Sequence, residues 1–265
     1  PSLDPAEIGD VVGGCALPEA EQGLNVTRLG AILAGLPKSV PGVQVNRFCS
    51  SGLQAVAMAA DRIRTGDEDV MIGCGTESMS MITMLGNKIV LNPKFYEDPA
   101  NLGLAMGMGL TAEKVADQWK INREDQDAFA LESHRRAMAG IQSGAFAAET
   151  ATYTVTSRTP DYATAQVKET ERVVKDDEGA RGDLNLEKLG KLKPVFAAKG
   201  SVTAGNASQM SDGAGALIMM SEAALKRYNV KPLARFVSFA VKGVPPEIMG
   251  IGPIEAIPAA LKKAG

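Results

Sequence analysis

Cys49 lies at a position where its thiol could act as a nucleophile. It follows a short alternating stretch, VQVN, and precedes an apolar helix that the spacing predicts from Ser50 to Arg64. The thiolate is the reactive form of cysteine, and the partial positive charge and unpaired N–H groups of a helix N-terminus favour it. These N–H groups would also face the oxyanion formed when the sulfur attacks a carbonyl. Because the next residues, Ser-Ser-Gly, are small, the pattern suits acyl transfer through a thioester. The alternative is a small cysteine packed in a core.

The sequence offers no evident base for this cysteine. Its one histidine, His134, lies in a charged segment, ALESHRRAMA, and we expect a solvated residue on a helix. The other cysteines, Cys15 and Cys74, lack a comparable setting and are expected to have packing roles. An odd number of cysteines predicts no disulfide framework and suits a reducing compartment. With one histidine and no paired cysteine motif, no metal site is expected.

The elements around Cys49 are predicted to form a parallel α/β layer. Strand patterns flank the helix that follows Cys49, and an earlier strand ends in glycines before a shorter helix. Strand–helix–strand order implies a βαβ unit with a parallel sheet and a right-handed crossover. The predicted strands are 10–15, 43–46 and 69–73, and the predicted helices are 26–35 and 50–64.

Beyond residue 78 the chain changes character, which predicts an inserted region. This region has loop-rich stretches, a helix capped by Thr111, a second helix capped by Asn122, and a polar segment with turn residues throughout. After it, Asp212 to Ser221 is predicted to be a fully buried strand followed by a helix. Residues 232–243 are predicted to begin another strand, and the chain then continues as a helix.

Composition and charge argue against several function classes. Of the 265 residues, 45% are hydrophobic and 22% charged, with a net charge of −3, close to an average globular domain. This charge indicates no broad surface for nucleic acid or anionic membranes. Apolar stretches are interrupted before they reach spanning length, so no transmembrane helix is expected, and the first residues lack the pattern of a signal peptide. Neither nucleic acid nor a membrane is therefore expected as a partner.

Three stretches of the sequence are similar to one protein family. They read NRFCSSGLQAV, GCGTESMS and GSVTAGNASQMSDGAGAL. In this order they resemble the nucleophile segment, the glycine-rich turn and the pantetheine-contacting segment of the thiolases (acetyl-CoA C-acyltransferases). The resemblance implies the thiolase fold, an α/β architecture of two related halves layered αβαβα, with a loop domain inserted in the first half. The implied boundaries are 1–78 for the first half, 79–210 for the loop domain, 211–231 for the returning strand and helix, and 232–265 for the start of the second half.

The resemblance implies roles for four residues. Cys49 matches the nucleophile that takes the acyl group, and its own N–H would contribute to an oxyanion hole. Ser208 matches the residue that hydrogen-bonds the pantetheine, Phe196 matches its apolar contact, and Arg181 matches a basic residue beside the adenine nucleotide. A planar, permanently charged guanidinium suits stacking and phosphates. Coenzyme A and acyl-CoA are thus implied as substrates, with no permanently bound cofactor and no metal.

The sequence departs from the family pattern in ways that bear on activity. The family's base histidine in GHPxG, its second cysteine in CxGGG and its NEAF-like asparagine are absent, as are its first strand and helix. We therefore expect the chain to cover part of the thiolase fold and to turn over poorly alone, since loss of a base costs about 10²–10⁴-fold. GLAMGMGLT has no histidine where biosynthetic thiolases carry one, which favours the degradative 3-ketoacyl-CoA class.

The expected reaction is thiolytic cleavage of a 3-ketoacyl-CoA to acyl-CoA and acetyl-CoA, or the reverse condensation, through an acyl-Cys49 intermediate. The alternative is a catalytically incompetent thiolase-like protein that binds CoA or lipid. A ketoacyl-synthase-like condensing enzyme is a further alternative, and a cysteine hydrolase a weaker one, because its histidine would have to lie in the chain. The family implies a homodimer or homotetramer. The cytoplasm is the expected compartment, with the mitochondrion and the peroxisome as alternatives.

Overall fold

The computed structural model describes residues 3–84 and 86–265. The chain divides into two compact units, the first comprising Pro1–Gly107 with Met210–Gly265 and the second Met108–Gln209. The domain boundaries implied by the family resemblance stay a prediction. In the described part of the chain, no helix combines the length and the apolar character needed to cross a membrane.

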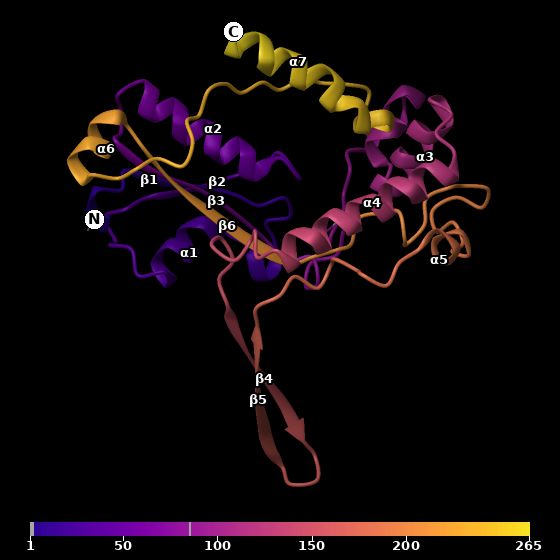
Figure 1. Ribbon diagram of the computed structural model, residues 1–265, viewed down its shortest axis with the longest axis horizontal. Coiled ribbons are helices and arrows are strands. Elements are labelled where there is room, and N and C mark those ends of the chain that lie inside the picture. Colours follow the sequence, from indigo (N-terminus) through magenta and orange to yellow (C-terminus); the bar gives the residue numbers. More distant parts are fainter. Residues whose placement is uncertain (1–2, 85) are drawn as a thin grey trace. The chain divides into compact units, whose positions relative to one another are not determined.

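The first unit is built on a four-stranded sheet (Figure 1). Its strands are β1 (Asp10–Gly14), β2 (Gly42–Val45), β3 (Val70–Glu77) and β6 (Gly213–Met220), in the order β2-β1-β3-β6. β1 pairs in parallel with both β2 and β3, which confirms the βαβ arrangement predicted from the sequence. β6 returns from far along the chain and pairs antiparallel with the whole of β3.

Two helices, α1 (Val26–Leu33) and α2 (Ser51–Arg64), lie on opposite faces of this sheet (Figure 1). Adjacent residues of a strand point to opposite faces. A Cβ on Gly13 of β1 would collide with Thr27 of α1, whereas a Cβ on Gly14 would collide with the first turn of α2. The paired glycines at the end of β1 therefore let both helices approach the sheet closely.

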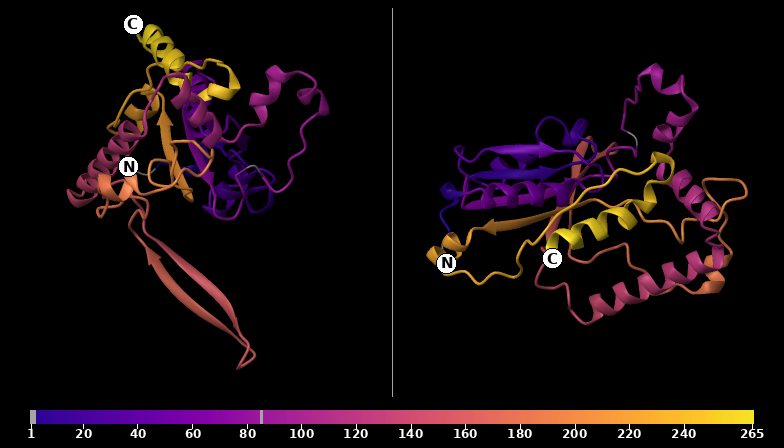
Figure 2. Two further views of the ribbon diagram at one scale, coloured as in Figure 1. Left: turned by 90° about the vertical axis from the view of Figure 1, so that its right-hand side faces the viewer. Right: turned by 90° about the horizontal axis from the view of Figure 1, so that it is seen from above.

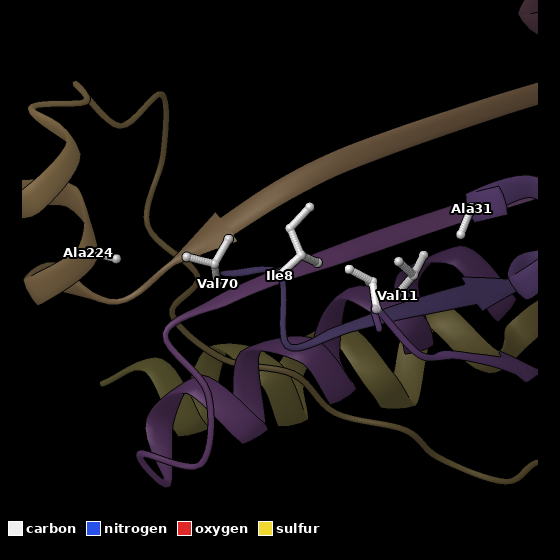
Figure 3. Packing of buried hydrophobic residues seen from close by; sticks show 6 residues of the cluster. Ile8, Val11, Ala31, Val70 and Ala224 are labelled. Carbon is white, nitrogen blue, oxygen red and sulfur yellow. The ribbon is translucent and has the colours of Figure 1, made fainter. Parts of the chain in front are cut away.

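The core of the first unit consists of two small clusters, one on each face of the sheet. Figure 3 shows the first, which joins α1 and the short helix α6 (Glu222–Tyr228) to the strands. Its buried members are Ile8, Val11, Ala31, Val40, Val70 and Ala224. The second lies under α2 and contains Val12, Ala55, Ala59 and Met71. The alanines of α2 follow the helical spacing that the sequence predicts.

β6 lies at the edge of the sheet, and the prediction that this strand is fully buried is wrong. Its residues 213–218 are exposed within the described chain, with Leu217 at 56% and Ile218 at 59% of their full exposure. Pairing with β3 satisfies the backbone along one edge, but the described residues leave more than half of Leu217 and Ile218 uncovered. An apolar run indicates that a segment suits burial, whereas its actual burial depends on what packs against it.

The predicted strand at 232–243 is also wrong, because these residues form no regular element. A strand requires a neighbour to accept its backbone hydrogen bonds, and the described residues pair no strand with this segment. The helix expected after it is present as α7 (Gly252–Ala264), preceded by the 3₁₀ helix η5 (Pro246–Ile251). The other 3₁₀ helices are η1 (Pro5–Glu7), η2 (Ala20–Gln22), η3 (Pro93–Tyr96) and η4 (Pro99–Ala105).

The second unit contains three helices and a two-stranded hairpin. Its elements are α3 (Met108–Gln118), α4 (Arg123–Gln142), β4 (Tyr153–Asp161), β5 (Gln166–Val174) and α5 (Leu186–Gly190). β4 and β5 pair with each other along their full length and extend away from the helices of their unit as an isolated ribbon (Figure 2). Sequence analysis missed this hairpin, because its strands are polar and lack the alternation that marks a half-buried strand.

The ends of the two long helices test the predicted caps. Asn122 caps α4, since its side chain accepts the backbone N–H of Asp125 at 2.8 Å. The cap assigned to Thr111 is wrong, because α3 begins at Met108 and the Thr111 hydroxyl donates to the Met108 carbonyl. The helix extends one turn further than its polar residues suggest, through GMGL, where glycine and methionine obscure the start.

Candidate active site

Cys49 is exposed on the turn that joins β2 to α2. The preceding residue, Phe48, has a φ of +46°, in the left-handed region that residues other than glycine rarely adopt. Ser50 is the N-cap of α2 but makes no side-chain capping hydrogen bond. No acceptor among the described residues pairs with the backbone N–H of Cys49. The turn therefore presents a thiol and a free N–H together at the start of a helix.

Two polar side chains close this turn. The Oδ1 atom of Asn46 accepts the N–H of Phe48 at 2.8 Å, and its Nδ2 atom donates to the carbonyl of Ala16 at 2.9 Å. The Oγ atom of Ser51 accepts the N–H of Arg47 at 2.8 Å and donates to the carbonyl of Phe48 at 2.6 Å. The backbone on both sides of the cysteine is thereby tied down.

Glu77, the last residue of β3, holds the chain that follows β1. Its carboxylate accepts the backbone N–H groups of Ala16 at 2.7 Å and Leu17 at 3.2 Å. Because β1, β2 and β3 are parallel, their carboxyl ends meet at one edge of the sheet, where α/β proteins bind ligands. The hydrogen bond from Asn46 to Ala16 joins this network to the turn that carries Cys49.

The other two cysteines lie in settings that oppose thiolate formation. Cys15 is buried, and its pKa is raised first by that burial and then by the nearby charge of Glu77. Burial likewise raises the pKa of Cys74. Both therefore stay neutral near pH 7, which agrees with the packing roles expected for them.

Arg181 lies on a loop of the second unit, where two sets of hydrogen bonds hold it. Its backbone N–H donates to Nδ1 of His134 on α4 at 3.1 Å. Its guanidinium donates to both carboxylate oxygens of Asp183, each at 3.1 Å. This pairing raises the pKa of Arg181 and lowers the pKa of Asp183. His134 lies on α4, as expected, and is half-buried beside this loop. A segment about 47 residues further along the chain covers it.

Phe196 and Ser208 lie in the long loop after α5. Phe196 packs beside Gly109 of α3, where any Cβ would collide with the phenyl ring, and it is 47% exposed. Ser208 is exposed, and its hydroxyl donates to the carbonyl of Gln209 at 3.2 Å. One aromatic face and one hydroxyl are thus accessible on the same loop.

Acidic side chains of α3 and α4 accept hydrogen bonds from this loop. Glu113 accepts the backbone N–H of Val202 at 2.9 Å. Asn206 donates to the carboxylate of Asp127 at 3.0 Å, and Asp127, only 4% exposed, also pairs with Arg123 at 2.8 Å. Asp127, the buried carboxylate of this group, is therefore paired, as a buried charge requires.

None of the hydrogen bonds among the described residues joins two of the four predicted site residues. Arg181, Phe196 and Ser208 all belong to the second unit. Their observed partners are Asp183 and His134 for Arg181, Gly109 for Phe196 and Gln209 for Ser208. Cys49 belongs to the first unit. The roles given to these four residues stay predictions. Among the described residues, no group of three or more His, Cys, Asp or Glu side chains is arranged to hold a metal ion.

Sequence reasoning missed three residues that organise the turn, namely Asn46, Ser51 and Glu77. All three lie within or beside the quoted segments VQVN, FCSSG and GTESMS. For Asn46 and Glu77 the available signal was their polarity at or shortly after the ends of predicted strands, where side chains gather in α/β proteins. Ser51 lies within the predicted helix and gave no such signal.

Comparison with known proteins places this architecture in one fold class. The dimeric peroxisomal thiolase of Saccharomyces cerevisiae has a TM-score of 0.83 and 33% identity, with 97% of this chain and 63% of that chain covered. The human mitochondrial 3-ketoacyl-CoA thiolase in complex with CoA has a TM-score of 0.82 and 36% identity, with 99% and 66% covered. The fold is thus the thiolase fold, over about two thirds of those chains.

The sequence comparisons identify the family. The family model described as "Thiolase, N-terminal domain" matches residues 1–223. The 3-ketoacyl-CoA thiolase of Bacillus subtilis is 47% identical over 267 residues, which cover 97% of this chain and 65% of that protein. This chain belongs to the thiolase family, and it spans less than two thirds of the length of that relative.

Proposed function

We propose that this protein is an acyltransferase that cleaves 3-ketoacyl-CoA with CoA, or runs the reverse condensation, through an acyl group on Cys49. The observation that carries the proposal is the exposed thiol at the start of α2, beside a backbone N–H without a partner among the described residues. The 3-ketoacyl-CoA thiolases among its relatives support this substrate class.

The chemistry has two half-reactions. The Cys49 sulfur attacks the 3-keto carbon, the bond between C2 and C3 breaks, and acetyl-CoA leaves after its enolate carbon takes up a proton. The acyl group stays on the sulfur as a thioester. The thiol of a second CoA then attacks this thioester, acyl-CoA leaves, and the proton returns to Cys49. Backbone N–H groups at the helix start suit the oxyanion of each step.

The proton transfers need a base and an acid. The single histidine of the chain is not assigned to them, because Nδ1 of His134 already accepts the Arg181 N–H. We assign His134 to the loop of Arg181 instead.

The second unit is proposed to bind the CoA moiety. Arg181 would lie beside the adenine nucleotide, Phe196 along the pantetheine, and Ser208 would hydrogen-bond the pantetheine arm. The similarity to a thiolase solved in complex with CoA supports this assignment. CoA acts here as a substrate, and no permanently bound cofactor is proposed.

We also propose that the protein forms a homodimer or a homotetramer, supported by its similarity to the dimeric peroxisomal thiolase of yeast. The proposed mechanism requires Cys49 to stay reduced, so a reducing compartment suits it.

Tryptic peptide mass spectrometry tests the proposal directly. Cleavage after Arg47 and Arg62 yields a peptide, Phe48–Arg62, that contains Cys49 and neither of the other cysteines. After incubation with a 3-ketoacyl-CoA, we expect an acyl mass on this peptide, removed by added CoA and absent in Cys49→Ala. Cys74→Ala, whose cysteine lies on another tryptic peptide, should keep the adduct. Binding of CoA without any adduct would support the alternative of a non-catalytic CoA-binding protein.

A further inference from the structure

The backbone conformation of Phe48, in the turn before Cys49, needs support that the Phe48 side chain does not supply. Phe48 holds a left-handed backbone conformation at φ +46°, which is strained for a residue other than glycine. The residue is 69% exposed, so side-chain packing does not hold the conformation. Hydrogen bonds from neighbouring side chains are the remaining source of support.

Ser51 supplies part of this support from inside the turn. Its side chain is nearly buried, with the residue only 4% exposed. The hydroxyl bridges from the N–H of Arg47 to the carbonyl of Phe48, and the Ser51 backbone N–H reaches the same carbonyl at 2.9 Å. Three hydrogen bonds of one serine therefore fix the two residues before Cys49.

Asn46 connects the turn to the sheet. Its carbonyl oxygen accepts the Phe48 N–H, and its amide nitrogen donates to the Ala16 carbonyl. This pattern needs one acceptor and one donor on the same side chain, which asparagine has and an ionised aspartate lacks. Because Glu77 in turn holds the Ala16 N–H at 2.7 Å, the direction of the turn is set by the ends of β1 and β3.

We propose that Asn46 and Ser51 are positioning residues that hold the Cys49 sulfur in line with the N-terminus of α2. This inference rests on the proposed function for its kinetic consequence, since it is the attack by sulfur that they position. Neither residue is assigned a contact with substrate.

Three variants, Asn46→Ala, Asn46→Asp and Ser51→Ala, test the inference. In each we expect kcat for thiolysis to fall about 10- to 100-fold, as for a displaced reacting atom, with the KM for CoA nearly unchanged. Alkylation of Cys49 by iodoacetamide at one fixed pH, followed on the Phe48–Arg62 peptide, should slow several-fold because the sulfur is displaced. A residue that only stabilised the fold would change neither the alkylation rate of Cys49 nor kcat in the folded protein.

Two matched controls remove the same kinds of hydrogen bond elsewhere in the first unit. Asn92 accepts the N–H of Lys94 at 3.1 Å, in the same two-residue pattern as Asn46 with Phe48. Ser221 starts α6, where its hydroxyl accepts the Ala224 N–H at 3.1 Å and donates to Asp69. Asn92→Ala and Ser221→Ala should keep the wild-type alkylation rate and kcat.

The outcomes separate the inference from the function it rests on. The inference would be overturned if the three variants kept the wild-type alkylation rate and the wild-type kcat. It would also be overturned if they raised the KM for CoA and left kcat unchanged. A wild-type protein that forms no acyl adduct would overturn the proposed function, whereas the alkylation rates would still decide the positioning. If circular dichroism finds Asn46→Ala unfolded, the equal-sized Asn46→Asp and the buried Ser51→Ala decide it.

Discussion

Phe48 is the residue whose backbone conformation costs most beside the proposed nucleophile. A left-handed φ is acceptable for glycine, tolerable for a residue such as phenylalanine and least acceptable for a β-branched residue. The position nevertheless carries an exposed phenylalanine, held by Asn46 and Ser51. Strained residues of this kind gather at functional sites, where the surrounding structure determines them.

Substitutions at Phe48 measure this strain. Phe48→Val should lower the free energy of unfolding by about 1–3 kcal/mol, because a β-branched residue opposes positive φ. Phe48→Gly should stay within about 1 kcal/mol of wild type, since relief of strain and the added freedom of the unfolded chain offset each other. Urea denaturation followed by circular dichroism checks both. Equal stability of the two variants would mean that the turn changes its conformation in solution.

Helix α4 shows how element ends are specified locally. Its N-cap, Asn122, was readable from sequence because the capping side chain and the N–H that it accepts lie three residues apart. The same helix carries Glu132, which pairs with Arg135 at 2.6 Å and with Arg136 at 2.7 Å. These local pairs stabilise a long helix that has few buried residues.

Removal of the α4 cap should weaken the second unit by a measurable amount. Asn122→Ala is expected to lower the free energy of unfolding by about 1 kcal/mol, because the Asp125 N–H loses its acceptor. Asn122→Asp keeps an acceptor and places a negative charge at the helix N-terminus, which the helix dipole favours. In thermal unfolding, Asn122→Ala should therefore have a lower melting temperature than Asn122→Asp. The reverse order would exclude capping by this side chain.

The ion pairs of Glu132 with Arg135 and Arg136 predict that the stability of the protein depends on pH. Hydrogen bonds from Arg135 and then Arg136 lower the pKa of Glu132 from 4.5 to about 2. A carboxylate with a lowered pKa in the folded state adds stability above its unfolded pKa and loses it as pH falls toward the folded pKa. The contribution should therefore disappear between about pH 4.5 and pH 2, and it should be small because the pair is solvent-exposed. Glu132→Gln should make the free energy of unfolding depend less on pH in this window. An unchanged pH dependence in the variant would contradict the pairing.

On the scale of the whole molecule, the main difference from the sequence-based predictions concerns burial. More apolar surface is exposed than the apolar segments of the sequence predict. Leu217 and Ile218 on β6 are more than half exposed, as is Ile254 on α7. The thiolases similar to this chain are longer, since it covers 63–66% of the solved chains compared above. Burial inferred from the sequence therefore exceeds the burial present in the described residues.

The β4–β5 hairpin should be separable from the rest of the second unit. Tyr153 and Val174 are paired residues at its base, so a short Gly-Asn turn can join them without moving the flanking chain. Replacing 154–173 in this way should change the free energy of unfolding by less than about 1 kcal/mol, because an isolated two-stranded ribbon is at best marginally stable. Chemical denaturation monitored at the single tryptophan, Trp119, would measure this. A larger loss would mean that the hairpin packs against another surface in solution.

The sequence by itself determined the parts of this protein that depend on neighbours along the chain. The parallel βαβ unit, the helix after Cys49 and the Asn122 cap were all predicted, because periodicity and capping operate over three to eight residues. The pattern around Cys49 indicated a candidate nucleophile, and the family resemblance supplied its proposed role and the proposed CoA contacts.

Only the tertiary structure decided which groups meet across long separations. The hydrogen bond from Asn46 to Ala16 joins residues 30 positions apart in the sequence, and the hydrogen bond from Arg181 to His134 joins residues 47 positions apart. The exposure of β6 and the irregular course of 232–243 likewise depend on whether a partner surface lies beside them. Local patterns record what a segment can do, whereas burial and long-range hydrogen bonds depend on which other segments come into contact with it.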